Sequence, residues 1–176
     1  MTIQTAVFGG GCFWCTEATL QNLKGVTEVV PGYAGGQAAN PSYEQISTGA
    51  TGHAEVVRVK FDPEVISYPE LLNVFFATHD ATTLNRQGND IGSQYRSIIL
   101  YADEAQKKAA VEFIDELNKE LGGKIVTQVE PLQEFYEAEE YHHDYFKKNP
   151  TAGYCQAIIS PKMAKMRKEF AKLLKE

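Results

Sequence analysis

Two cysteines three residues apart stand in the stretch Gly9–Cys15, which reads Gly-Gly-Gly-Cys-Phe-Trp-Cys. A short apolar run precedes the glycines and a helical pattern follows, so we expect Cys12 to begin a helix. Unpaired backbone N–H groups at a helix N-terminus stabilise an anion, which favours a thiolate over a thiol. We therefore interpret Cys12 as a nucleophile, beside which Phe13 and Trp14 form an apolar wall.

Glu55 is the second candidate for chemistry. A strand is predicted over residues 54–61, and its alternation places Val57, Val59 and Phe61 on one face together with Glu55. A carboxyl that faces an apolar interior has a raised pKa, which suits a general acid at neutral pH. The alternative is that the strand begins one residue later and Glu55 lies in solvent, and periodicity leaves both open.

The chain has two further thiols, Cys15 and Cys155. Cys12 and Cys15 form a C-x-x-C pair, which is also typical of thioredoxin-like dithiols. Cys155 follows Gly153 in a segment that we expect to be mobile, and a mobile thiol suits resolution of an oxidised Cys12. The alternative for Cys155 is a buried, inert cysteine. One C-x-x-C pair without a suitably placed histidine pair is weak evidence for zinc, and we expect no metal.

Two polar loops hold further candidate side chains. Tyr43 lies in the first, over residues 35–53, and Asp90 and Tyr95 lie in or next to the second, over residues 80–94. Long loops inside a compact domain are usually functional. Tyrosine hydroxyls and an aspartate near a thiolate could bind a polar oxygen, although each of them alone is more typical of a turn or of packing.

A helix is also predicted over residues 137–147. It contains two Glu-x-x-His spacings, formed by Glu139, Glu140, His142 and His143, with Asp144 beside them. Di-metal bundles need such motifs on two different helices. We therefore interpret these residues as a solvated polar face.

The elements that position these residues follow from hydrophobic periodicity. Strands are predicted over 6–8, 26–33, 54–61, 97–101 and 125–129, and helices over 13–24, 68–79, 104–121, 137–147 and from 160 onward. This order predicts an α+β fold: a mixed or antiparallel sheet with helices packed on it, of split-βαβ, ferredoxin-like type. We expect one catalytic domain over residues 1–176, whose last part, about 156–176, is a helical tail.

The bulk composition excludes several classes of protein. The net charge of −6 argues against a nucleic-acid binder. No apolar run is long enough to span a bilayer, and the N-terminus lacks the pattern of a signal peptide, so we expect a cytoplasmic protein without a membrane partner. Three cysteines, an odd number, argue against a structural disulfide framework.

Several blocks of residues together resemble the peptide methionine sulfoxide reductase A family. The blocks are Gly11-Cys12-Phe13-Trp14, Gly52-His53-Ala54-Glu55, Gln87-Gly88-Asn89-Asp90 and Tyr95-Arg96-Ser97, followed by Ala138-Glu139 and Gly153-Tyr154-Cys155. They occur in order over nearly the whole chain, and the Gly-Cys-Phe-Trp motif is highly specific.

The resemblance implies a cofactor-free enzyme that reduces the S epimer of methionine sulfoxide, free or in oxidised proteins. In that family Cys12 corresponds to the nucleophile, Glu55 to the proton donor for the sulfoxide oxygen, and Phe13 and Trp14 to the pocket for the methyl group. The remaining carried-over residues are Tyr43 and Tyr95, which would bind the oxygen, and Asp90, which would hold the polar network. Cys12 would become a sulfenic acid, condense with a second thiol, and be regenerated by thioredoxin.

The resemblance leaves the resolving cysteine open. Many relatives have glycine at the position of Cys15, and relatives with a Gly-Tyr-Cys segment often continue into a glycine-rich tail that this chain lacks. We prefer Cys155 as the resolving thiol, with Cys15 as the alternative and a relay through both as a third route.

Two other classes of function compete with the reductase. A general dithiol oxidoreductase would use Cys12 and Cys15, but the chain lacks a tryptophan just before the first cysteine and Gly-Pro between the pair. A non-catalytic zinc module would use the same cysteines with histidines. We expect a monomer.

Overall fold

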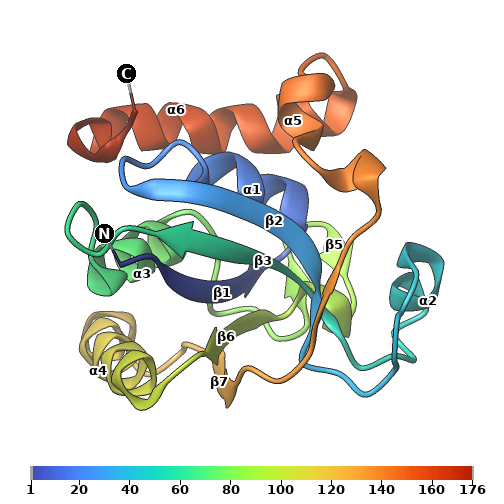
Figure 1. Ribbon diagram of the computed structural model, residues 1–176, viewed down its shortest axis with the longest axis horizontal. Helices are drawn as coiled ribbons and strands as arrows, with labels where there is room; N and C mark the ends of the chain where they lie inside the picture. The colour runs from blue at the N-terminus through green and yellow to red at the C-terminus, as the bar shows by residue number, and fades with distance from the viewer. Residues whose placement is uncertain (1, 176) are drawn as a thin grey trace.

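A six-stranded sheet forms the centre of the computed structural model, which describes residues 2–175. Its strand order is β7-β6-β1-β3-β2-β8 (Figure 1). The strands are β1 (Gln4–Gly10), β2 (Val26–Ala34), β3 (Ala54–Phe61), β6 (Ser97–Tyr101), β7 (Gln128–Pro131) and β8 (Phe135–Glu137). The four central strands are antiparallel, and β7 pairs in parallel with β6, so the sheet is mixed.

Helices connect these strands. They are α1 (Phe13–Leu20), α2 (Tyr43–Ser47), α3 (Tyr68–Ala77), α4 (Glu104–Leu121), α5 (Tyr145–Lys148) and α6 (Ser160–Glu169). The sequence β1-α1-β2 followed by β3-α3-β6 places β1 and β3 between β6 and β2, which is the split-βαβ arrangement predicted from the sequence. The α+β fold class is therefore confirmed.

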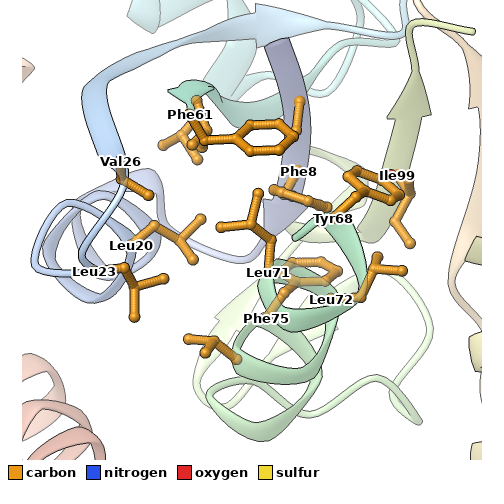
Figure 2. Close-up of a cluster of buried hydrophobic side chains, with 14 of the residues drawn as sticks. Phe8, Leu20, Leu23, Val26, Phe61, Tyr68, Leu71, Leu72, Phe75 and Ile99 are labelled. Carbon is orange, nitrogen blue, oxygen red and sulfur yellow. The ribbon is translucent and has the colours of Figure 1, made fainter. Parts of the chain in front are cut away.

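The main core lies between one face of the sheet and helices α1, α3 and α4. Apolar residues of β1 and β3 on this face meet the apolar sides of α1 and α3, as Figure 2 shows for Phe8, Phe61, Leu20 and Phe75. Phe8 stacks on Phe75, with ring centroids 5.0 Å apart. Helix α6 packs on the outer side of α1 (Figure 1). The N-terminal helix is thereby held between the sheet and the C-terminal helix.

Local signals explain where several helices begin and end. Ser67 and Glu70 form the predicted capping box at the start of α3, and Asp103 caps α4. Gly122, with φ of 70°, ends α4 in the left-handed conformation that glycine adopts without strain. A second capping box, from Ser42 and Gln45, starts the short helix α2 inside the segment that was predicted as a loop.

The predicted helix over residues 137–147 is wrong. Its first residue, Glu137, instead pairs with Gly32 in the edge strand β8. A 3₁₀ turn over Glu140–His142 follows, and Asp144, with a φ of 54°, separates it from the one-turn helix α5. The Glu-x-x-His pattern does not report on a helix face, because tertiary pairing with β2 decides the conformation here.

Two further boundaries differ from the prediction. The strand predicted at 125–129 begins only at Gln128, because the N–H groups of Ile125 and Val126 donate to Asn118 and Ala81 rather than to β6. Helical structure before Ser160 was also not predicted: a π-helical segment, Cys155–Ile159, runs directly into α6.

Among residues 2–175, no helix combines the length and apolar character that a membrane crossing requires.

Candidate active site

Cys12 lies at the point where β1 turns into α1. Gly11 has a φ of 98°, which side-chain-bearing residues rarely adopt, and a Cβ there would lie 2.6 Å from Cγ of Gln87. Cys12 is the N-cap residue of α1, and its carbonyl accepts from the Cys15 N–H at 3.1 Å. The glycine turn thus places the thiol at the helix N-terminus, as the sequence predicted.

The Glu55 side chain points to the same place from β3. It is 2% exposed, and its Oε1 accepts from the backbone N–H of Phe13 at 3.2 Å. Burial raises the pKa of Glu55 to about 8. The buried alternative of the two left open by the sequence is therefore the one observed, and the carboxyl holds its proton at neutral pH next to Cys12.

Cys12 and Cys15 shift each other's pKa. Burial, followed by the neighbouring Cys15 and Glu55, raises the pKa of Cys12. The hydrogen bond with Cys12, together with Lys162 and Tyr154, lowers the pKa of Cys15 to about 7. Burial of Cys12 thus opposes the stabilisation that the helix N-terminus gives to a thiolate, and the two neighbouring thiols titrate as one interacting pair.

Tyr95 packs on the apolar cluster that contains Cys12, and the ring of Tyr43 lies 4.7 Å from that of His142, between centroids. Burial raises the pKa of each, and the charges of Glu55, Cys12 and Asp90 raise it further. Both phenols therefore remain protonated hydrogen-bond donors. Asp90, from strand β5 (Asp90–Ile91) of the small hairpin with β4 (Arg86–Gln87), accepts from the hydroxyl of Tyr154 at 2.9 Å.

The two aromatic residues after Cys12 have different surroundings. Phe13 is buried in the core against Tyr33 at 5.6 Å between ring centroids. Trp14 is partly exposed, and one face of its indole stacks on Tyr145 with centroids 3.7 Å apart and planes at 7°. Trp14 packs on the apolar cluster that contains Cys12, whereas neither ring is among the residues that line the cleft at this thiol.

The segment over residues 138–145 contributes contacts that the sequence interpretation missed. Glu139 accepts from the hydroxyl of Tyr33 at 2.9 Å and from the N–H of Tyr43 at 3.1 Å. His142 is 1% exposed and accepts from the indole N–H of Trp14. The interpretation of these residues as a solvated face is therefore wrong for His142, whereas Glu140 is exposed as predicted. Tyr145, which stacks on Trp14, was the aromatic signal that could have indicated packing here.

Cys155 is fully buried in the π-helical segment and does not lie in a loose break. It belongs to one apolar cluster with Cys12 and Cys15. Burial, followed by the charge of Cys15, raises the pKa of Cys155.

Two clefts open on the surface. One, of about 460 Å³, is lined by Cys12, Cys15, the 87–90 hairpin, Tyr154 and the start of α6. A larger cleft of about 630 Å³ lies on the opposite face of the sheet, where Ile98 and Leu100 line it and no thiol reaches it. The smaller cleft is the one that matters for cysteine chemistry. Among residues 2–175, no group of three or more His, Cys, Asp or Glu side chains could hold a metal ion.

Comparisons with known proteins agree with this geometry. Residues 4–174 match a family model described as peptide methionine sulfoxide reductase. A protein of Sulfolobus acidocaldarius named peptide methionine sulfoxide reductase MsrA is 56% identical over 168 residues, which cover 96% of both chains. The reduced form of Mxr1 from Saccharomyces cerevisiae superposes with a TM-score of 0.83 at 37% identity, covering 87% of this chain and 89% of that one. A complex of Mxr1 with Trx2 superposes with a TM-score of 0.60 at 28% identity, covering 81% of this chain and 84% of that chain.

Proposed function

The chain belongs to the peptide methionine sulfoxide reductase family, and from this premise we infer that it reduces methionine-S-sulfoxide, free or in proteins, to methionine. The observation that carries the mechanism is the Glu55 carboxyl, buried, protonated at neutral pH and bonded to the N–H of the residue after Cys12. A sulfoxide oxygen is a poor leaving group until it is protonated, so a thiol nucleophile needs such an acid beside it.

The first step needs a nucleophile, a proton donor and side chains that hold the substrate. Cys12 passes its proton to the thiolate of the neighbouring Cys15, and its sulfur attacks the sulfoxide sulfur. Glu55 gives its proton to the sulfoxide oxygen, which Tyr43 and Tyr95 hold as donors, while Asp90 fixes the polar network around it. Phe13 and Trp14 hold the methyl group. The oxygen passes to Cys12, methionine leaves, and Cys12 becomes a sulfenic acid.

The second step converts the sulfenic acid into a disulfide that a reductant can reduce. We propose that Cys15, which lies one helical turn from Cys12 in the same apolar cluster, condenses with the sulfenic acid to give a disulfide and water. Cys155 then attacks Cys15 and releases Cys12; its place in the same buried cluster and the effect of the Cys15 charge on its pKa support this step. Thioredoxin reduces the final disulfide by thiol–disulfide exchange.

The function is tested by supplying the two epimers separately. With thioredoxin and a regenerating system we expect methionine from the S epimer and none from the R epimer. Equal turnover of both would contradict the assignment. Reduction of insulin disulfides in the absence of any sulfoxide would favour the competing dithiol oxidoreductase instead.

The relay is tested by comparing two variants in one turnover without reductant. Cys155→Ser should still form a Cys12–Cys15 disulfide, whereas Cys15→Ser should accumulate a sulfenic acid on Cys12 that a dimedone-type reagent captures. A Cys12–Cys155 disulfide that forms in Cys15→Ser as fast as the wild-type disulfide would show that Cys155 resolves Cys12 directly.

We also propose that residues 1–176 act as a single catalytic domain, as a monomer in the cytoplasm. Helices α1 and α6, from the two ends of the chain, pack against each other, which supports one domain. The three free thiols suit a reducing compartment.

A further inference from the structure

We propose that His142 is a positioning residue that holds the indole of Trp14, and through it the apolar wall of the substrate pocket; this inference rests on the function proposed above. The indole N–H of Trp14 donates to Nδ1 of His142 at 3.0 Å. An indole can only donate, so Nδ1 must carry a lone pair and the imidazole proton must lie on Nε2. Burial lowers the pKa of His142, which keeps Nδ1 free to accept.

The ring of His142 packs against three of the residues that we propose hold the substrate. Its ring centroid lies 5.0 Å from that of Phe13, 5.7 Å from that of Trp14 and 4.7 Å from that of Tyr43. Phe13 and Trp14 come from α1 and Tyr43 comes from α2. One side chain therefore sets the relative placement of the methyl pocket and of a donor to the sulfoxide oxygen.

The second nitrogen of His142 shows that packing alone does not account for this residue. Nε2 is buried and has no hydrogen-bond partner among residues 2–175. A buried donor without a partner is unfavourable for folding, and an apolar ring of similar size would fill the same space without that cost. What histidine supplies and such a ring cannot is the acceptor for the Trp14 indole.

Contacts on both sides of His142 fix its place. Before it, Glu139 binds the Tyr33 hydroxyl and the Tyr43 N–H. After it, the N–H of Asp144 donates to Oε2 of Glu17 on α1 at 3.0 Å. Tyr145 then covers one face of the Trp14 indole. The stacking fixes the plane of the indole, and the hydrogen bond to His142 fixes its rotation within that plane.

Two substitutions separate the acceptor from the ring. His142→Phe keeps an aromatic ring and removes the acceptor, whereas His142→Asn places an amide oxygen where Nδ1 stands. Trp14 is the sole tryptophan, so its fluorescence reports on the indole directly. We expect His142→Phe to shift the emission of Trp14 and His142→Asn to restore more of the wild-type emission.

The functional readout is discrimination between methionine sulfoxide and ethionine sulfoxide, which carries an ethyl group in place of the methyl. A loosened wall admits the larger group, so His142→Phe should discriminate less between the two substrates. We expect kcat/KM for methionine sulfoxide divided by kcat/KM for ethionine sulfoxide to fall by about five- to tenfold, because one neutral hydrogen bond usually contributes a free energy of this size. His142→Asn should recover part of the ratio. An unchanged ratio and emission in His142→Phe, or an asparagine variant no better than the phenylalanine variant, would overturn the inference.

His143→Asn is the matched control, because His143 bonds the carbonyl of Ala138 and does not bond Trp14. It should leave both the emission and the ratio at wild-type values, and an equal change there would trace the effect to the segment and not to His142. The wild-type protein separates the two proposals. If it fails to reduce either sulfoxide the proposed function is wrong, whereas wild-type turnover with an indifferent His142→Phe contradicts this inference alone.

Discussion

At the scale of single residues, the chemistry depends on which of Cys12, Cys15 and Glu55 carry a proton when the thiol attacks the sulfoxide. Burial raises the pKa of Glu55 to about 8, whereas Cys12 and Cys15 titrate as an interacting pair. The places of Cys12 at a helix start and of Glu55 on a buried face could be predicted, because a glycine turn and a strand alternation each leave a readable pattern. The burial that opposes ionisation of Cys12 could not, because it depends on the C-terminal segment and the 87–90 hairpin, which are distant in sequence.

The rate of methionine formation in a single turnover should depend on pH at both ends. The thiol pair must lose one proton, with a pKa of about 7 for Cys15, and Glu55 must keep its proton, which it loses above about 8. As the pH increases, we expect the rate to rise near the pKa of Cys15 and to fall near the pKa of Glu55. Glu55→Gln should lower the rate by about 10²- to 10⁴-fold and remove the fall on the alkaline side. A rate in Glu55→Gln equal to that of the wild type would exclude Glu55 as the acid.

At the scale of elements, the β1–α1 turn depends directly on its glycines. Gly10 and Gly11 pass between α3 and the 87–90 hairpin, with a Cβ on Gly10 2.9 Å from the ring of Phe75. This turn could be predicted from three consecutive glycines. The segment 138–145 could not, because its contacts with Trp14, Tyr33 and Tyr43 all cross more than 90 residues of sequence.

Gly11→Ala should weaken both the fold and the site. The left-handed φ costs a side-chain-bearing residue about 1–2 kcal/mol, and the new methyl group must also displace Gln87. We expect urea unfolding to show a loss of stability of that size, together with a lower kcat/KM. Gly153→Ala is the control, because a Cβ there meets no atom within 4 Å, and it should unfold like the wild type. Equal stability of the two variants would contradict this account of the turn.

Glu17 on α1 accepts a hydrogen bond from the N–H of Asp144 at the start of α5, and its burial makes the free energy of unfolding depend on pH. It is 1% exposed, and burial raises its pKa to about 7 from an ordinary value of 4.5. The folded state therefore binds more protons than the unfolded state between these values, and the free energy of unfolding falls as the pH rises through them. The largest loss from this one group is about 3 kcal/mol.

Urea unfolding at pH 5 and pH 8 measures this loss. Glu17→Gln should lose less stability than the wild type between the two pH values, because the amide does not ionise. The exposed Glu120→Gln on α4 should keep the wild-type pH dependence. Identical pH dependence in Glu17→Gln and the wild type would show that the Glu17 carboxyl is not held as described.

At the scale of the whole molecule, the order of strands and helices followed from the sequence, because each of the central elements carries its own periodicity and caps. The pairing β6-β1-β3-β2 follows from that order within the split-βαβ arrangement. The C-terminal third was predicted less well. There, short elements such as β8 and α5 take their conformation from the sheet edge and from Trp14 and not from local propensity.

The whole arrangement brings three thiols and one carboxylic acid together near the start of α1. That combination is suited to one reaction, in which a sulfoxide gives its oxygen to Cys12 and the protein emerges with a disulfide. The role of Cys12 is therefore the claim on which the rest depends.

The most direct measurement is intact and peptide mass spectrometry after one equivalent of methionine-S-sulfoxide, without reductant. We predict one equivalent of methionine and a protein that has lost two hydrogens, with Cys12 as the attacking residue, and neither change in Cys12→Ser. No methionine and three unchanged thiols in the wild type, or full methionine formation in Cys12→Ser, would contradict the account.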